Sequence, residues 1–199
     1  MIKAVLFDLG GVVFTRGMTQ FTKYVAEKHG RDQKAIYESL KSSALLNAYY
    51  EGKISRDEFY ASLKENLQID DDVNELEQKL FEVYQVIQET KQIVQKVRSK
   101  NKVYFLSDNF KERVEYADKK YGFISWFDGG VFSHVVGVRK PNKKIYEIAI
   151  KEVGLRPEQM LFIDDKEINL PPANELGIKT LLYKDPIQLE NELKRMKIV

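Results

Sequence analysis

The amino-acid sequence predicts an α/β fold, and three observations carry that prediction. The run from Ala4 to Phe7 is continuously apolar, which is typical of a parallel strand buried on both faces. Residues 18–86 show helical periodicity with almost no strand pattern. From residue 89 onward, short apolar strands alternate with helical segments, as in a parallel sheet with right-handed crossovers. We therefore expect a Rossmann-like parallel sheet core with a helical-bundle cap. The predicted boundaries are 1–16 plus 88–199 for the core and 17–87 for the cap.

The first strand is followed directly by a carboxylate, Asp8. Burying an unpaired carboxylate costs several kcal/mol, so Asp8 is expected at the C-terminal end of the strand. Gly10 and Gly11 allow the backbone to turn sharply there and to approach a ligand closely. Ligands of open parallel sheets bind at this end of the strands.

The predicted cap contains four short helices. Gly30 and Gly52 are typical helix C-terminal stops, and Ser55 with Glu58 three residues later forms a capping box. The apolar sets that define the helices are Phe21 to Val25, Ile36 to Tyr49, Phe59 to Leu63, and Leu76 to Tyr84.

The segment after residue 88 alternates between helices and strands. Pro141 and Pro172 suit first helical positions, and Gly177 suits a helix C-cap. The expected helices are Thr90 to Val97, Phe110 to Tyr121, Pro141 to Val153 and Pro172 to Leu176; the expected strands are Lys102 to Leu106, Gly130 to Ser133, Met160 to Ile163 and Ile178 to Tyr183.

Composition excludes several classes of protein. The net charge of the 199 residues is +2, with the charges interspersed, so no nucleic-acid partner is expected. The absence of cysteine excludes disulfides, thiol nucleophiles and sulfur-bound zinc. No segment resembles a signal peptide or a membrane span, so we expect no membrane partner and a cytoplasmic location. Neither composition nor pattern distinguishes a monomer from a homodimer.

Polar side chains follow the predicted strands at the sheet edge where ligands bind. They are Asp8, Ser107, Lys140, Asp164 and Asp165. Clustered carboxylates repel one another unless a cation lies among them, and Mg²⁺ prefers such oxygen ligands together with substrate phosphate. With Mg²⁺ bound, the Asp8 carboxylate would attack a phosphoryl group and form an aspartyl-phosphate. Ser107 would donate a hydrogen bond to the phosphoryl oxygens, and Lys140 would add a positive charge.

Four motifs in this order resemble those of the haloacid dehalogenase-like (HAD) hydrolases. They are D-x-x-G-V beginning at Asp8, Ser107 after a strand, Lys140 within R-K-P-N-K-K-I-Y, and the pair Asp164 and Asp165. Together they span nearly the whole chain. The pattern is similar to the subfamily I type, in which an all-helical cap is inserted after motif one.

The resemblance implies individual roles. It places the nucleophile on Asp8, a backbone-carbonyl metal ligand on Gly10, the phosphate-binding hydroxyl on Ser107, and the family's lysine on Lys140, which serves catalysis and phosphate binding.

The resemblance also implies roles around the acidic pair. Asp165 looks like the direct metal ligand, with Asp164 in a supporting metal-binding position. Asn169 resembles the polar residue that orients the acidic loop. Asp108 lies beside the phosphate-binding hydroxyl, where an asparagine is common, although a negative charge there is unfavourable for binding phosphate.

Gly10 is the one departure from the family pattern. In HAD phosphatases, an aspartate at this position protonates the leaving oxygen and then activates water. Glycine keeps the carbonyl ligand but loses general acid-base catalysis, which is usually worth about 10² to 10⁴ in rate. The expected function is therefore a Mg²⁺-dependent phosphohydrolase for a small phosphorylated metabolite, such as a sugar phosphate. Either its substrates have good leaving groups, as in sugar 1-phosphates and acyl phosphates, or the acid comes from the cap or the substrate.

Two alternatives are a non-hydrolytic phospholigand-binding protein and a 2-haloacid dehalogenase. The acidic pair argues against the dehalogenase, because carbon–halogen displacement gains nothing from a Mg²⁺ site.

Overall fold

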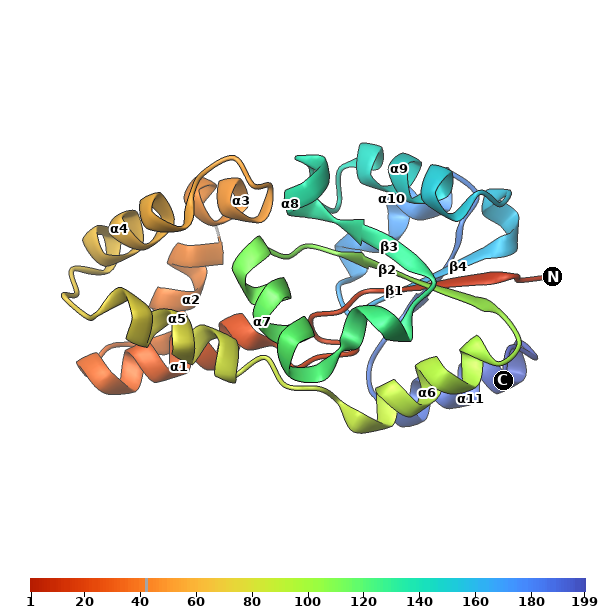
Figure 1. Cartoon of the computed structure of the whole chain (residues 1–199), viewed down its shortest axis with the longest axis horizontal. Helices are drawn as coiled ribbons and strands as arrows, with labels where there is room; N and C mark the ends of the chain where they lie inside the picture. The colour runs from red at the N-terminus through yellow and green to blue at the C-terminus, as the bar shows by residue number, and fades with distance from the viewer. Residues whose placement is uncertain (42) are drawn as a thin grey trace.

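The computed structural model describes residues 1–41 and 43–199. In this described part, the centre of the fold is one parallel sheet with the strand order β3-β2-β1-β4-β5 (Figure 1). The strands are β1 (Ala4–Phe7), β2 (Lys102–Ser107), β3 (Gly129–Phe132), β4 (Met160–Asp164) and β5 (Lys179–Leu182). The predicted Rossmann-like α/β fold is confirmed.

Strand β1 occupies the middle of the sheet. Ala4 pairs with Lys102 of β2 on one side and with Met160 of β4 on the other. The same register continues to Phe7, so the residues that follow β1, β2 and β4 meet at one edge. This arrangement brings together side chains that lie far apart in the sequence.

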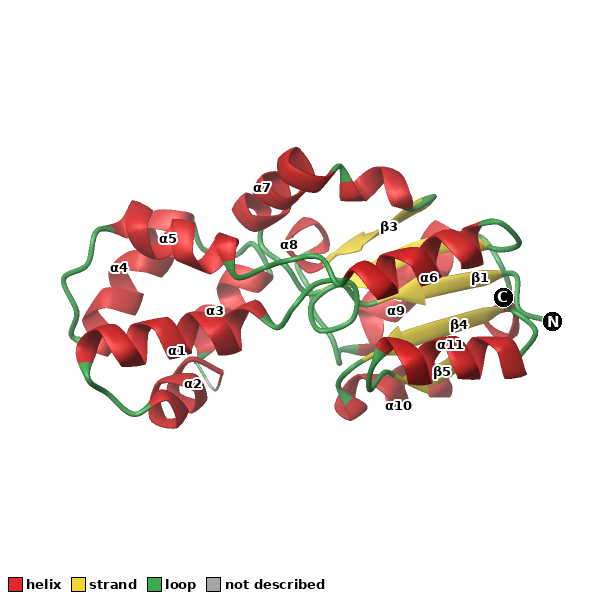
Figure 2. Cartoon of the chain, turned by 90° about the horizontal axis from the view of Figure 1, so that it is seen from below, coloured by secondary structure: helices red, strands yellow, loops and turns green. Residues whose placement is uncertain are grey.

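Helices cover both faces of the sheet (Figure 2). Helices α6 (Gln88–Arg98) and α11 (Pro186–Arg195) lie on one face, and α9 (Lys143–Val153) and α10 (Leu170–Glu175) lie on the other. Side chains of a strand alternate between the two faces. Accordingly, Val5 and Phe7 belong to the apolar cluster under α6 and α11, whereas Ala4 and Leu6 belong to the cluster under α9 and α10. Shorter elements complete this part: α7 (Lys111–Tyr121), η1 (Phe123–Trp126), α8 (Ser133–Val136), η2 (Pro157–Gln159) and η3 (Glu167–Asn169).

The helices between β1 and α6 form a separate group beside the sheet (Figure 1). They are α1 (Gly17–His29), α2 (Gln33–Lys41), α3 (Ala44–Tyr50), α4 (Arg56–Leu67) and α5 (Val73–Glu82). Their apolar faces pack into a cluster of their own, which includes Phe21, Leu63 and Leu80. We refer to this group as the cap, and its exact boundaries stay a prediction. No helix of the described residues is long and apolar enough to cross a membrane.

Three predicted helix boundaries are wrong, for local reasons. The helix expected from Ile36 to Tyr49 is two helices, because Ser43 is the N-cap of α3 and its side chain accepts a hydrogen bond from the Leu45 N–H. Helix α9 begins at Lys143 rather than Pro141, with Asn142 as its N-cap. Helix α10 begins two residues before Pro172.

Candidate active site

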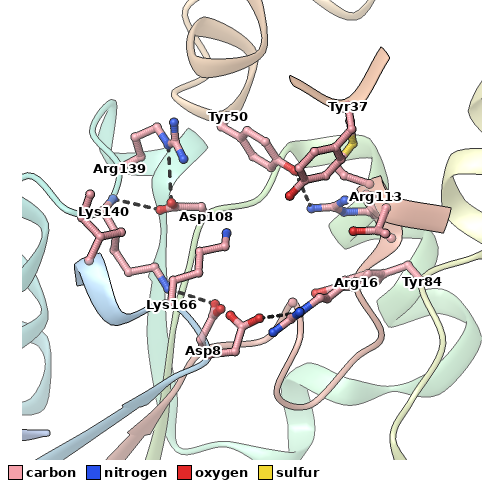
Figure 3. A pocket seen from close by; sticks show the side chains of 16 residues that line it. Asp8, Arg16, Tyr37, Tyr50, Tyr84, Asp108, Arg113, Arg139, Lys140 and Lys166 are labelled. Atoms are coloured by element: carbon pink, nitrogen blue, oxygen red, sulfur yellow. Dashed lines mark hydrogen bonds and ion pairs between the residues drawn. The ribbon is translucent and has the colours of Figure 1, made fainter. Parts of the chain in front are cut away.

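The candidate site is a cavity of about 390 Å³ between the C-terminal edge of the sheet and the cap (Figure 3). The predicted site residues on its wall are Asp8, Gly10, Asp108, Lys140 and Asp165. The other three, Ser107, Asp164 and Asn169, are buried and do not line the cavity.

Lys140 is the electrostatic centre of the site. Its Nζ lies 2.9 Å from Asp8 Oδ1 and 2.7 Å from Asp164 Oδ2, and it donates a hydrogen bond to the Leu106 carbonyl. The residue is only 2% exposed. Burial by itself lowers the pKa of Lys140, but the carboxylates of Asp164 and Asp8 raise it well above its usual value. Lys140 therefore holds a fixed positive charge beside Asp8.

Asp8 is buried where β1 ends, and its Oδ1 accepts a hydrogen bond from the Leu9 N–H. Burial raises the pKa of Asp8 to about 7, although Lys140 acts in the opposite direction. Further positive charge beside Asp8 would favour its ionised, nucleophilic form.

Asp164 is held by the loop that follows β4. Its carboxylate accepts hydrogen bonds from Asn169 Nδ2, from the Lys166 N–H and from Lys140 Nζ, at distances between 2.7 and 3.0 Å. The bond from Asn169 fixes the orientation of this carboxylate.

Asp165 has an unused oxygen. Its Oδ2 accepts a hydrogen bond from Arg16 Nε at 2.7 Å, whereas its buried Oδ1 has no hydrogen-bond partner among the described residues. Asp8, Asp164 and Asp165 each offer a carboxylate oxygen within 4.8 Å of the others. An orphaned carboxylate oxygen beside two further carboxylates fits a hard divalent cation.

Ser107 is the last residue of β2 and Asp108 follows it, but their side chains lie in different environments. The buried Ser107 Oγ has no hydrogen-bond partner among the described residues, so its donor is available. Asp108 accepts hydrogen bonds from the Lys140 N–H at 3.0 Å and from Arg139 Nε at 3.4 Å. The charge of Asp108 is thus paired with Arg139, and its carboxylate holds the loop that carries Lys140.

The turn after β1 is shaped by the two glycines. A Cβ atom at Gly10 would lie 3.8 Å from Tyr84 Cε2 and 4.0 Å from its hydroxyl, which are ordinary contacts. Gly11 has a φ of +94°, and a Cβ atom there would lie 2.3 Å from Asp165 Oδ2. Glycine at position 11 therefore permits the close approach of the acidic loop.

Several cavity residues were not predicted from the sequence. They are Arg16, Tyr50, Tyr84, Arg113, Arg139 and Lys166. Arg139 precedes Lys140 and Lys166 follows Asp165 in the sequence, so their places near the site could have been predicted. Arg113 lies within α7 and Tyr50 ends α3; no motif marks either of them.

Comparison with known proteins identifies the family of this chain. A model of the haloacid dehalogenase-like hydrolase family matches residues 2–177. An uncharacterised protein of Dictyostelium discoideum is 27% identical over 92% of this chain and 91% of its own length. The D-ribitol-5-phosphate phosphatase of Bacteroides thetaiotaomicron is 23% identical over 97% of each chain.

Structural comparison gives the same fold. A HAD family enzyme of Bacteroides thetaiotaomicron, solved in complex with magnesium and inorganic phosphate, superposes with a TM-score of 0.77. The match has 23% identity and covers 92% of this chain and 95% of that one. The family match spans strands β1 to β4 and all the residues that line the cavity, and the chain therefore belongs to the haloacid dehalogenase-like hydrolases.

Proposed function

We propose that this hydrolase is a Mg²⁺-dependent phosphohydrolase for a small phosphorylated metabolite. The observation that carries the proposal is the arrangement around Lys140: a buried ammonium group contacts the Asp8 carboxylate, and the orphaned Asp165 oxygen lies in the same carboxylate cluster. The phosphatase activity named in the sequence comparison, and the magnesium and phosphate bound in the structural neighbour, support the same chemistry.

Asp8, Asp165 and the Gly10 carbonyl would hold the Mg²⁺, with Asp164 as a supporting carboxylate. When bound, the ion supplies charge neutralisation for the carboxylate and the phosphoryl group. Asp8 attacks phosphorus, and the bond between phosphorus and the leaving oxygen breaks, which gives an aspartyl-phosphate on Asp8. Lys140 stabilises the charge that develops on the phosphoryl oxygens. The family resemblance assigns a donor role to Ser107, whose hydroxyl is buried behind the cavity wall and has no partner among the described residues.

The leaving group departs without a carboxylic acid at position 10. The hydroxyl of Tyr84 lies 4.0 Å from the position of a Cβ atom at Gly10. Burial raises the pKa of Tyr84 well above its ordinary value, so this hydroxyl is a hydrogen-bond donor rather than a proton source. Esters with stable leaving groups, such as sugar 1-phosphates and acyl phosphates, are therefore the expected substrates.

The test is phosphate release from a panel of phosphomonoesters, with and without Mg²⁺, by the wild type and by Asp8→Asn. We expect Mg²⁺-dependent turnover that favours leaving groups of low pKa and disappears in Asp8→Asn. Asp57→Asn, which changes an 88% exposed carboxylate in the cap, is the matched control and should keep full activity.

Two results would contradict the proposal. Binding of phosphate without turnover of any ester would identify a phospholigand-binding protein. Metal-independent chloride release from 2-chloro acids would identify a dehalogenase.

A further inference from the structure

The wall of the cavity is rich in positive charge. The cationic side chains on its wall are Arg16, Arg113, Arg139, Lys140 and Lys166. Three of them contact carboxylates: Arg16 contacts Asp165, Arg139 contacts Asp108, and Lys140 contacts Asp8 and Asp164. Within the described residues, Arg113 and Lys166 have no carboxylate within ion-pair distance.

Arg113 is a buried cation surrounded by neutral groups. It is only 4% exposed, its Nε donates to Asn109 Oδ1 at 2.7 Å, and its Nη2 donates to the Tyr50 hydroxyl at 3.4 Å. Its guanidinium also lies over the rings of Tyr84 and Phe110, at 4.6 and 4.4 Å from their centroids. Ring contacts offset only part of the cost of burying a charge, so an anion beside Arg113 would stabilise it further.

Lys166 reaches the same region from the opposite side. It follows Asp165 in the loop after β4, but its side chain extends away from Asp8 toward the Tyr50 side of the cavity (Figure 3). Lys166 and Tyr50 also line a smaller adjoining recess of about 90 Å³, whose other walls include Met18, Leu40 and Leu46. The two unpaired cations and the Tyr50 hydroxyl therefore mark a second polar end of the cavity.

We propose that the substrate carries, besides its phosphate ester, a second anionic group that binds Arg113, Lys166 and the hydroxyl of Tyr50. This proposal rests on the proposed function, because it assumes that the ester lies at Asp8. A carboxylate or a second phosphate would match the donors, since arginine forms strong hydrogen bonds with either group. A cavity of about 390 Å³ is large enough for both ends of a small metabolite.

The test compares 4-carboxyphenyl phosphate with 4-carbamoylphenyl phosphate. The two esters are nearly the same size and have activated phenol leaving groups, but only the first has a distal negative charge. We expect the wild type to favour the carboxylate by about tenfold or more in kcat/KM, mainly through KM, as for a charge-assisted hydrogen bond. A 1,4-phenylene bisphosphate shows whether a second phosphate is preferred to a carboxylate.

Arg113→Gln and Lys166→Gln should each lower this preference toward unity. Lys111→Gln, which changes a 68% exposed lysine on the same helix as Arg113, should retain it. Because Arg113 is buried and its variant can fail to fold, Lys166→Gln is the decisive variant. Equal kcat/KM for both esters in the wild type, or an unchanged preference in Lys166→Gln, would overturn the proposal.

A binding measurement tests the second anion-binding site separately from the phosphohydrolase activity. Calorimetry of the matching carboxyphenyl and carbamoylphenyl phosphonates, with Mg²⁺ present, needs no turnover. A tenfold tighter carboxylate complex that is lost in Lys166→Gln would support the second site even if no ester were hydrolysed. Turnover of both esters with equal phosphonate affinities would support the phosphohydrolase and exclude the second site.

Discussion

Gly10 and Gly11 are neighbours in the turn after β1, but a Cβ atom at each would meet different surroundings. At Gly10 the nearest atoms belong to the ring of Tyr84 and lie at ordinary contact distance. At Gly11 a Cβ atom would overlap the carboxylate of Asp165, in a backbone conformation that L side chains rarely adopt. A side chain can therefore be added at position 10 without a clash, but not at position 11.

Gly10→Asp should extend hydrolysis to esters with poor leaving groups. A Cβ atom at position 10 meets only ordinary contacts and the position faces the cavity, and a positioned acid is worth about 10² in rate or more. In a single turnover, we expect the rate of Asp8 phosphorylation to rise for alkyl phosphates and to change little for aryl phosphates of low leaving-group pKa, with Gly10→Ala as the control. A uniform effect across the leaving-group series would show that the aspartate acts in another way.

Gly11→Ala should weaken Mg²⁺ binding, because the added methyl group displaces the Asp165 carboxylate. The measurement is the rise in Tm on adding Mg²⁺, which should be largely lost in Gly11→Ala and kept in Gly10→Ala. The same rise in all three proteins would exclude Asp165 as a metal ligand.

Helix α1 is joined to the loop before α5 by one buried carboxylate. Asp71 lies 2.6 Å from Lys28 Nζ and 2.8 Å from His29 Nε2, at the end of α1. Burial raises the pKa of Asp71, but Lys28 and His29 lower it more, so the pKa lies below its ordinary value. The ionised form of Asp71 therefore stabilises the packing of the cap helices.

Asp71→Asn should lower the free energy of unfolding by about 2 to 3 kcal/mol at pH 7, because Lys28 and His29 lose their shared, buried partner. Because the pKa is lowered on folding, this stabilisation is complete above the unfolded-state pKa of about 4 and is lost as the pH falls below it. Urea unfolding at pH 7 and pH 3 should show the difference between wild type and variant shrinking at pH 3. An equal difference at both values would contradict the ion-pair interpretation.

The strands were predictable because their apolar runs are compact and end in polar residues. The break between α2 and α3 was missed, since apolar periodicity continues past Ser43 while its side chain caps the next helix.

The motifs predicted which residues gather at the sheet edge. Arg113 gave no such signal, because a polar residue within a helix is ordinarily solvated, and only the packing of α7 against the cavity places it there. The individual roles of the site residues stay predictions.

The cap is also held against the sheet through α3 and α8. Ser133 Oγ donates to the Tyr50 carbonyl at 2.5 Å, and the Tyr49 hydroxyl donates to Glu112 of α7 at 2.8 Å. Gly52, with a φ of +64°, lies so close that a Cβ atom there would be 2.5 Å from the His134 carbonyl oxygen. This contact sets the position of Tyr50 in the cavity.

Gly52→Ala should therefore impair both stability and catalysis by pushing α3 away from α8. We expect kcat/KM to fall by about tenfold or more, as small displacements of binding groups can cause. Gly30→Ala is the matched control: its φ is +62°, but a Cβ atom there meets nothing within 4 Å. Gly30→Ala has the same cost of about 1 to 2 kcal/mol for placing an L residue in a left-handed backbone conformation, and it should leave kcat/KM unchanged. Equal activity of the two variants would show that this contact does not position Tyr50.

The register of β1 also determines when the site forms during folding and synthesis. Ala4 must pair with Lys102 and Met160, so the central pairings of the sheet close longer loops than the contacts among the cap helices do. Long-range parallel pairing is slow, and local helical contacts are fast. The cap is expected to fold early on the ribosome. Asp8, the proposed nucleophile, is made early but must wait for β4, which ends at Asp164 and precedes Asp165, before the proposed phosphate site is complete.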